Sequence, residues 1–280
     1  MTKNIYEMVT ERIIEKLESG TIPWKKPFVD GEAINWKTQK AYRGINTLLL
    51  EAGEYATFKQ IKEAGGKVKK GAKSSIVVFW KILEKEDKEE EKIEKIPILR
   101  YYRVFKVGEQ TENIKPKNTN NKFNHKPIEQ AERILKNFQD KPMITNSQGR
   151  AYYQPTLDIV NVPPKSSFPK IHEYYSTFFH ELVHSTGHSK RLSREGVVNI
   201  DSFGSEKYSK EELIAEIGAS MLCGVCGIEN KTLDNSASYI QSWLSVLQND
   251  KTLIVKASQQ AQKASDYIQG IEYQTKQKVS

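Results

Sequence analysis

Two histidines and a glutamate stand within five residues of each other, as His180, Glu181 and His184. On a helix, side chains four positions apart lie about one turn above each other, so both imidazoles can reach the same cation. A glutamate beside the first histidine can then accept the proton of a water bound to that cation. These residue types at this spacing are typical of a zinc hydrolase. The sequence therefore predicts one Zn²⁺ site, with His180 and His184 as ligands and Glu181 as the catalytic base.

The residues around this motif favour a buried helix. The pattern alone also fits two surface histidines beside a carboxylate, because a chain of 280 residues can match it by chance. The segment is, however, apolar around much of a helix circumference, at Ile171, Tyr174, Tyr175, Phe178, Phe179, Leu182 and Val183. A buried helix that carries two histidines and a glutamate needs a polar partner for these groups, and a metal ion supplies one. We therefore favour a metal site over a solvated helix face.

A catalytic zinc usually has three protein ligands and a water, so a third ligand is needed. The candidates are Glu211, Glu212 and Glu216, of which the last two lie one turn apart on one helix face. This arrangement resembles glutamate zincins, and the resemblance implies that Glu212 is the third ligand and that Glu216 accepts a hydrogen bond from a ligating histidine. Glu212 could instead cap its own helix, because Ser209 precedes it by three residues. Glu216 and Glu211 then remain the alternative ligands.

Length and composition indicate a globular chain, for which two domains are the expectation. The longest apolar runs, such as residues 76–80, are far too short to cross a bilayer, and residues 1–17 are charged and helical in pattern rather than a signal peptide. We therefore expect a soluble, cytoplasmic protein that makes no membrane contact. The two cysteines, Cys223 and Cys226, have the spacing of a redox motif. They lie in an apolar helical run, which favours two buried, reduced thiols.

The positive charge is unevenly distributed along the chain. The formal net charge is +8, and residues 1–125 contain 25 Lys and Arg against 18 Asp and Glu, whereas residues 126–280 contain 18 against 17. A basic module joined to a nearly neutral one indicates that the first module binds a polyanion, and nucleic acid is the natural candidate.

Aromatic and basic residues interleave in this basic part. Unpaired strands expose base faces that stack on aromatic rings, while their phosphates meet cations, so this mixture favours single-stranded nucleic acid. Many of these aromatics could equally be core residues, and scattered lysines are common on any surface. The residues that we predict to contact DNA are Trp24, Lys25, Lys26, Trp36, Tyr42, Arg43, Asn46, Lys67, Lys69, Lys70 and Lys73.

Local patterns divide the chain into a basic domain at residues 1–110, a linker rich in Asn and Lys at 111–126, and a second domain at 127–280. The expected fold class is α+β, with a mixed α/β first domain and a mainly helical second domain that contains a small sheet. The expected helices cover residues 4–18, 57–64, 127–138, 171–187, 210–227, 237–248 and 253–273, and the expected strands cover 76–82, 96–107, 143–146 and 151–162. The charged run at 84–95 is expected to be a solvated hairpin tip or a disordered loop.

Further short motifs occur in order along nearly the whole chain. In the first domain they are Pro23-Trp24, Asn35 with residues 38–40, residues 42–46, Thr57-Phe58, residues 65–71 and Tyr102 with residues 104–105. In the second they are residues 152–158, 180–184, 187–188 and 191–194, Tyr208, residues 211–216, and Tyr239 with Trp243. Together they resemble the ArdC-type antirestriction proteins. That resemblance implies a single-stranded-DNA-binding domain followed by a zincin-like metallopeptidase domain, carried by plasmids or other conjugative elements to protect incoming DNA from host restriction.

Three functions are consistent with these features. The first is an antirestriction protein that binds single-stranded DNA and carries a zinc peptidase acting on an unidentified protein substrate. The second is a non-catalytic protein that binds and protects single strands and holds a structural metal. The third is a nuclease or another hydrolase that uses the same metal. Replacement of Glu181 separates them, because it leaves the fold and the metal in place.

Overall fold

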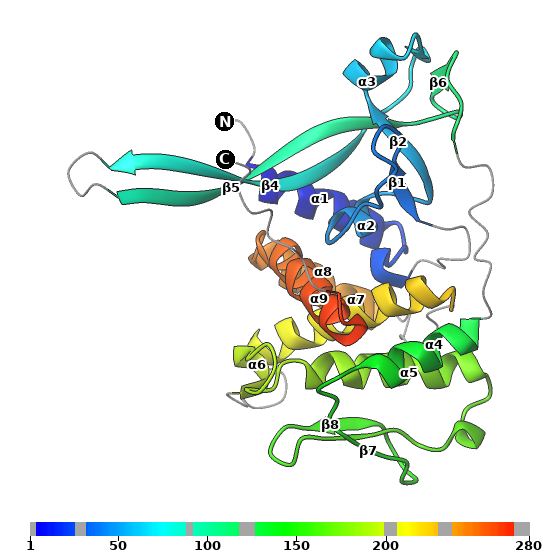
Figure 1. Ribbon diagram of the computed structural model, residues 1–280, viewed down its shortest axis with the longest axis vertical. Helices are drawn as coiled ribbons and strands as arrows, with labels where there is room; N and C mark the ends of the chain where they lie inside the picture. Colours follow the sequence, from blue (N-terminus) through cyan, green and yellow to red (C-terminus); the bar gives the residue numbers. More distant parts are fainter. Residues whose placement is uncertain are drawn as a thin grey trace. The chain divides into compact units, whose positions relative to one another are not determined.

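The computed structural model describes residues 4–25, 32–87, 92–117, 127–198, 206–228 and 237–271. The chain forms two compact units, one from Met1–Glu15 with Glu32–Asn121 and the other from Lys16–Gly31 with Lys122–Ser280. Each unit contains helices and at least one sheet, so the α+β class is confirmed (Figure 1). Residues 16–25, which we placed in the first domain, pack with the second unit.

Helix α1 (Ile5–Glu18) forms where the sequence places a capping box. The Glu7 amide donates to Asn4 Oδ1 at 3.0 Å and the Asn4 amide donates to Glu7 Oε2 at 3.1 Å, which satisfies two backbone donors at the helix start. Val9, Ile13 and Leu17 are buried along one face. The helix ends at Glu18, and the turn after it contains Gly20, which adopts φ +79° and donates its amide to the Leu17 carbonyl.

A four-stranded sheet forms the centre of the first unit, in the order β1-β2-β5-β4. Strand β1 runs parallel to β2, and the other neighbours are antiparallel. The strands are β1 (Ala33–Asn35), β2 (Gly53–Thr57), β4 (Ser75–Asp87) and β5 (Lys92–Lys106). Figure 1 shows β4 and β5 as a long hairpin that continues well past the other two strands. Strand pairing continues through much of the charged run, to Asp87 opposite Lys92, and residues 88–91 lie outside the described part.

Smaller elements complete the first unit. Helices α2 (Asn46–Leu49) and α3 (Phe58–Glu63) flank β2, and strand β3 (Lys67–Val68) pairs with β6 (Thr111–Glu112). The linker predicted at 111–126 is therefore wrong at its start. Its first residues form a strand, and Ile114 is buried in a cluster with Ala56, Ile61 and Val107. Residues 118–126 lie outside the described part.

The second unit is mainly helical, as expected, with a small sheet of order β7-β9-β8. Its helical elements are η1 (Pro23–Lys25), α4 (Pro127–Asn137), η3 (Lys165–Ser167), α5 (Ile171–Ser185), α6 (Glu195–Val198), α7 (Glu206–Cys226), α8 (Ala237–Asn249) and α9 (Leu253–Gln269). Its strands are β7 (Met143–Thr145), β8 (Tyr152–Gln154) and β9 (Ile159–Asn161). The single strand expected at 151–162 is wrong, because a turn that contains Asp158 at φ +53° folds it into β8 and β9.

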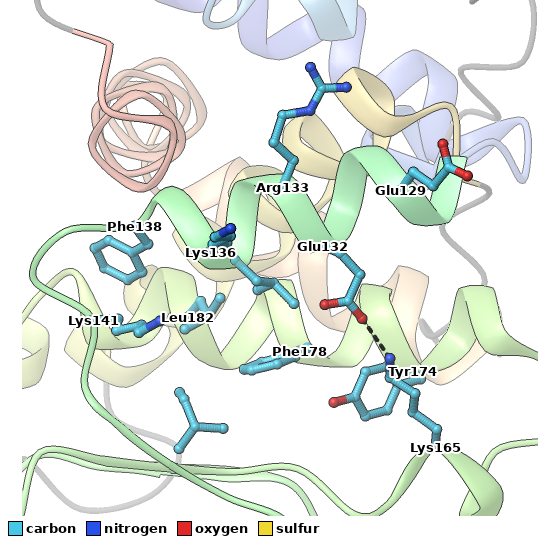
Figure 2. A pocket seen from close by; sticks show the side chains of 12 residues that line it. Glu129, Glu132, Arg133, Lys136, Phe138, Lys141, Lys165, Tyr174, Phe178 and Leu182 are labelled. Carbon is cyan, nitrogen blue, oxygen red and sulfur yellow. Dashed lines mark hydrogen bonds and ion pairs between the residues drawn. The ribbon is translucent and has the colours of Figure 1, made fainter. Parts of the chain in front are cut away.

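Helices α5 and α7 pack closely, and this contact positions the candidate metal ligands. Figure 1 shows α5 between α7 and the small sheet, and Figure 2 shows Phe178 and Leu182 of α5 lining a pocket beside α4. A Cβ atom on Gly218 of α7 would lie only 2.8 Å from Val183 Cγ2 of α5, so glycine allows the two helices to approach. Both helices bury long apolar faces, with Phe179, Leu182, Leu213 and Ile217 all fully or almost fully buried.

Candidate metal centre and nucleic-acid groove

His180 and His184 project from the same face of α5, as their spacing predicts. Their Nε2 atoms lie 3.1 Å apart, and the two rings meet edge to face. Glu212, on the neighbouring turn of α7, faces both of them. Its Oε2 lies 3.5 Å from His180 Nε2 and its Oε1 lies 3.4 Å from His184 Nε2. One ligand atom from each of the three residues can be chosen so that all lie within 4.8 Å of one another.

These separations fit a metal ion. In a tetrahedral zinc site with bonds of about 2.0–2.1 Å, neighbouring ligand atoms are about 3.3 Å apart, which is close to the distances between the three side chains. Two histidines and one glutamate also form a ligand set of catalytic zinc sites, and they leave the fourth position open. The geometry thus brings Glu212 to the two histidines, as the zincin resemblance implies.

A buried carboxylate orients His184 from the side opposite the ligand atom. His184 Nδ1 lies 3.4 Å from Glu211 Oε1. Burial alone would lower the pKa of His184, but this hydrogen bond and the charges of Glu212, Glu211 and Glu181 outweigh it and raise the pKa to about 9. A metal ion would displace the proton on Nε2 of this cationic ring, whereas Glu211 holds the proton on Nδ1, so the ring would present Nε2 to the metal.

Glu211 is in turn fixed by Arg194. The guanidinium donates from Nε to Glu211 Oε2 at 2.9 Å and from Nη2 to Oε1 at 2.5 Å, and both side chains are buried. Burial would raise the pKa of Glu211, but the hydrogen bonds from Arg194 and His184 hold it below its usual range. Glu211 is therefore a carboxylate at neutral pH.

Glu216 does not take the role that the zincin resemblance implies. Its Oε2 accepts a hydrogen bond from Trp24 Nε1 at 2.9 Å and a short one from the Tyr239 hydroxyl. Burial raises the pKa of Glu216 to about 7, against the lowering effect of the Tyr239 and Trp24 hydrogen bonds. The prediction that Glu216 orients a ligating histidine is thus corrected: the carboxylate that bonds to a histidine nitrogen on the far side from the metal position is Glu211.

Glu181 and the two cysteines are also buried. Glu181 lies on α5 one position after the first ligand, with 9 % of its surface exposed. Cys223 and Cys226 on α7 are free and buried, as expected, and burial raises the pKa of the Cys223 thiol to about 12. Both sulfurs are therefore protonated packing groups rather than redox or metal-binding thiolates.

The first unit contains a groove of about 850 Å³ on its four-stranded sheet. The floor is formed by β4 and β5, and the rim by the turn after β1 and by helix α3. The lining residues are Asn35, Lys37, Ala41, Tyr42, Arg43, Asn46, Thr57, Lys59, Gln60, Glu63, Val77, Val78, Phe79, Tyr102 and Val104. The Phe79 and Tyr102 rings stack with centroids 4.8 Å apart and planes 9° from parallel, and the Tyr102 side chain is 55 % exposed.

Comparisons with known proteins agree with this two-part organisation. Residues 3–105 match the N-terminal domain of the anti-restriction factor ArdC, and residues 129–260 match a zincin-like metallopeptidase family. The crystal structure of the antirestriction protein ArdC from plasmid R388, in its metal-free form, is similar with a TM-score of 0.75 and 36 % identity, over 96 % of this chain and 98 % of that one. This chain belongs to the ArdC family of antirestriction proteins. The Mn(II)-bound form of the R388 protein is similar with a TM-score of 0.76.

Further ArdC-like segments occur in other relatives. A protein of Escherichia coli named DNA primase TraC is 34 % identical over 296 residues, which cover 96 % of this chain but only 20 % of that protein. The protein y4eC of Sinorhizobium fredii is 30 % identical over 286 residues and is 91 % covered. In the described part of this chain, no helix is both long and apolar enough to cross a membrane.

Of the residues predicted to contact DNA, the structure brings Tyr42, Arg43 and Asn46 to the groove of the ArdC-like first unit. Asn46 is a correction, because its amide is already used by the backbone of Val78. Asn46 Nδ2 donates to the Val78 carbonyl at 2.8 Å, and the Val78 amide donates to Asn46 Oδ1 at 2.7 Å. Asn46 therefore holds α2 to β4, and with only 9 % of its surface exposed it presents little of its amide to a base.

Of the two tryptophans, Trp24 is also corrected, whereas a DNA contact of Trp36 stays a prediction. Trp24 is fully buried in the second unit, where it bonds to Glu216 and packs edge to face on Trp243, so its ring has no face for a nucleotide. Trp36 donates to the Lys115 carbonyl at 2.9 Å, and Lys117 Nζ lies 4.5 Å from its ring centre. One face of Trp36 is thus already covered by a cation.

Those predicted lysines whose side chains the structure describes lie outside the groove lining. Lys67, Lys69, Lys70 and Lys73 are exposed around strand β3 and the turn that follows it. The side chains of Lys25 and Lys26 lie outside the described part. The structure adds Lys37 and Lys59 at the rim and the Phe79–Tyr102 pair on the floor. The alternation of Phe79 with Val77 and of Tyr102 with Val104 places all four on one sheet face, a signal that was present in the sequence.

Proposed function

We propose that this ArdC-family protein binds single-stranded DNA through its first unit and hydrolyses peptide bonds of a protein substrate at a zinc centre in its second unit. The observation that carries the proposal is the assembly of His180, His184 and Glu212 from two packed helices, with Glu181 beside the first ligand. The match of residues 129–260 to zincin-like metallopeptidases supports peptide bonds as the target.

Zinc at this position would supply Lewis acidity, lowering the pKa of a water towards 7 and polarising a carbonyl. Glu181 is buried next to His180, and we assign it to accept the proton of the attacking water and then pass it to the leaving amine. His184 keeps its proton on Nδ1 because Glu211 accepts it there. We propose zinc because of the two imidazoles and one carboxylate, whereas the R388 relative holds Mn(II) in one of its crystal structures.

Replacement of the proposed base tests the peptidase. We expect purified Glu181→Gln protein to bind zinc as the parent does, but to cleave a mixed peptide library about 10²–10⁴-fold more slowly, because general-base catalysis contributes that much. Glu173→Gln is the matched control, since Glu173 lies on the same helix three turns before His184 and outside the ligand set. Cleavage is followed by mass spectrometry and zinc content by metal analysis.

The outcome also separates the alternative functions. If Glu181→Gln still protects transferred DNA in recipient cells as well as the parent does, the metal is structural and the protein acts by binding single strands. If the parent cleaves DNA and leaves polypeptides intact, the centre belongs to a nuclease. Either result contradicts the proposed peptidase.

The groove on the first unit supports the DNA part of the proposal. Its floor offers the exposed ring of Tyr102 for stacking on a base, and Lys37, Arg43 and Lys59 line it with positive charge. The amino-terminal match to ArdC covers all the residues of the groove. Aromatic rings beside cations suit an unpaired strand, because its base faces are exposed and can stack on the rings while its phosphates contact the cations.

A salt titration tests the backbone contacts of this groove. We expect the affinity for a fluorescent oligo(dT) to fall steeply with salt concentration, and Lys59→Ala to reduce the slope of log affinity against log salt by about one contact. Lys62→Ala is the matched control, because Lys62 is exposed on the same helix but outside the groove lining. Equal slopes for Lys59→Ala and Lys62→Ala would place the strand elsewhere, and Lys69→Ala or Lys70→Ala would then show whether it follows β3.

A further inference from the structure

Two adjacent carboxylates in the second turn of α7 both approach His184. Glu211 Oε1 lies 3.4 Å from Nδ1 of the ring, and Glu212 Oε1 lies 3.4 Å from Nε2. The two acids have the same side chain and neighbouring positions. A divalent cation would accept either of them as a ligand. A contact made by only one of the two acids must therefore determine which acid binds the metal and which one bonds to the histidine.

Arg194 makes this assignment through a two-pronged contact. Its Nε and Nη2 donate to the two oxygens of Glu211 at 2.9 and 2.5 Å, which is the fork geometry that fixes both the position and the rotation of a carboxylate. Two further donors bond to the last turn of α5 and to the residue that follows it. Nη1 donates to Thr186 Oγ1 at 2.7 Å, and Nη2 also donates to the Val183 carbonyl at 2.7 Å.

The loop after α5 folds back on the helix and thereby places Arg194 next to Glu211. The Arg194 amide donates to the Gly187 carbonyl at 2.9 Å, and the Leu192 amide donates to the Thr186 carbonyl at 2.8 Å, so the chain folds back on the end of the helix. A Cβ atom on Gly187 would lie 2.5 Å from Val197 Cγ2 and 3.0 Å from Arg194 Nη2. Glycine at this position thus leaves the space that the guanidinium and α6 occupy.

We propose that Arg194 is a positioning residue of the metal centre. It holds Glu211 by both oxygens, so that Glu211 orients His184 and stays out of the coordination sphere, and Glu212 remains the acid that binds the metal. This inference rests on the proposed metal centre but not on peptide hydrolysis. It predicts that loss of the fork changes both the affinity for metal and the number of ligands.

Arg191 provides a matched control on the same loop. Its side chain is 2 % exposed, and it pairs with Asp158, donates to the Ser185 carbonyl at 2.7 Å and donates to the Asp140 carbonyl at 3.0 Å. It is thus another buried arginine that ties this loop to its surroundings. None of these partners is Glu211 or a member of the ligand set.

The experiment compares Arg194→Lys and Arg191→Lys in the full chain. We expect Arg194→Lys to bind Zn²⁺ about 10–100-fold more weakly in competition with a chelating dye, because residues that orient metal ligands contribute that much. The absorption spectrum with Co²⁺ in place of zinc should lose the intensity of a four-coordinate site as Glu211 joins the metal. Arg191→Lys should lower Tm. It should keep the parental Zn²⁺ affinity within about threefold and the parental Co²⁺ spectrum, because the contacts that orient the metal ligands are unchanged.

A second pair of variants guards against a general loss of structure. Arg194→Ala leaves Glu211 unpaired, whereas Arg194→Ala combined with Glu211→Gln removes the competing carboxylate. The double variant should therefore regain a four-coordinate Co²⁺ spectrum that Arg194→Ala alone lacks. Parental affinity and spectrum in Arg194→Lys, or an equal loss in Arg191→Lys, would overturn the inference. A parent that binds metal without cleaving peptides would remove the proposed function and leave this inference standing.

Discussion

The metal centre and the groove differ in how their residues are held. The proposed metal ligands His180, His184 and Glu212 come from two helices in direct contact, and a buried pair, Glu211 and Arg194, holds His184 on the side away from the proposed metal. The groove takes its cations from a turn and a short helix, and its lysines are exposed. A reaction centre needs a fixed geometry, whereas a site for a flexible strand can tolerate mobile side chains. Substitutions should therefore have sharp effects at the first site and graded effects at the second.

The largest effect is expected from loss of the acid ligand. Glu212→Ala should weaken Zn²⁺ binding by more than about 100-fold, because residues that only orient ligands already contribute 10–100-fold. Affinity for single-stranded DNA should stay within about twofold, since the groove lies in the first unit. Zinc titration and oligo(dT) binding on the same sample check both statements. Glu216→Gln is the control: it should keep the metal affinity, because Glu216 bonds to Trp24 and Tyr239.

A smaller but still clear effect is expected from the stacking residue. Tyr102→Ala should weaken single-strand binding by about 1–3 kcal/mol, the usual contribution of one aromatic ring to a stacked base. Tyr101→Ala is the matched control, since Tyr101 is also exposed but points to the opposite sheet face. Fluorescence anisotropy at one fixed salt concentration compares the two. Similar losses in both variants would show that the strand does not use the groove floor.

The sequence was most informative where one helix carries the whole pattern. His180, Glu181 and His184 could be found because helical spacing alone brings them to one face. Glu212 could be assigned only from the resemblance to glutamate zincins, because the spacing of residues along the sequence does not predict how α7 packs on α5. The role of Arg194 could not be predicted from the sequence, since it depends on a loop that folds back on α5 through the Gly187 contact.

The wrong predictions arose from contacts between distant parts of the chain. Glu216 has the spacing to orient a ligand, but Trp24, which lies 192 residues earlier, donates to it instead. Trp24 itself stands beside two lysines in a segment bounded by prolines, a pattern typical of an exposed loop, yet its ring is fully buried. Asn46 follows a basic, aromatic segment, but its side-chain amide forms hydrogen bonds with the backbone of Val78. In each case a polar side chain was assigned to a ligand when another part of the protein satisfies it.

The smallest effect, and the only gain, is expected at Glu63 in the groove. Its Oε2 lies 3.2 Å from Lys37 Nζ and its Oε1 lies 3.8 Å from Lys59 Nζ. One carboxylate therefore partly neutralises two of the lysines that we propose to contact the phosphates of the DNA strand. These are exposed ion pairs, and breaking such pairs costs little. Glu63→Gln removes the competing charge and should raise affinity for oligo(dT) about twofold at low salt, with the gain fading as salt screens the lysines.

The control for this change is Glu112→Gln, because Glu112 is exposed in the same unit but lies outside the groove lining. Both variants raise the net charge by one, so a general electrostatic effect would strengthen binding equally in the two. A gain confined to Glu63→Gln locates the phosphates at Lys37 and Lys59, next to the ring of Tyr102. Unchanged or weaker binding in Glu63→Gln would mean that the carboxylate itself receives a donor from the strand, such as a base amino group, and that the groove reads bases rather than attracting phosphates.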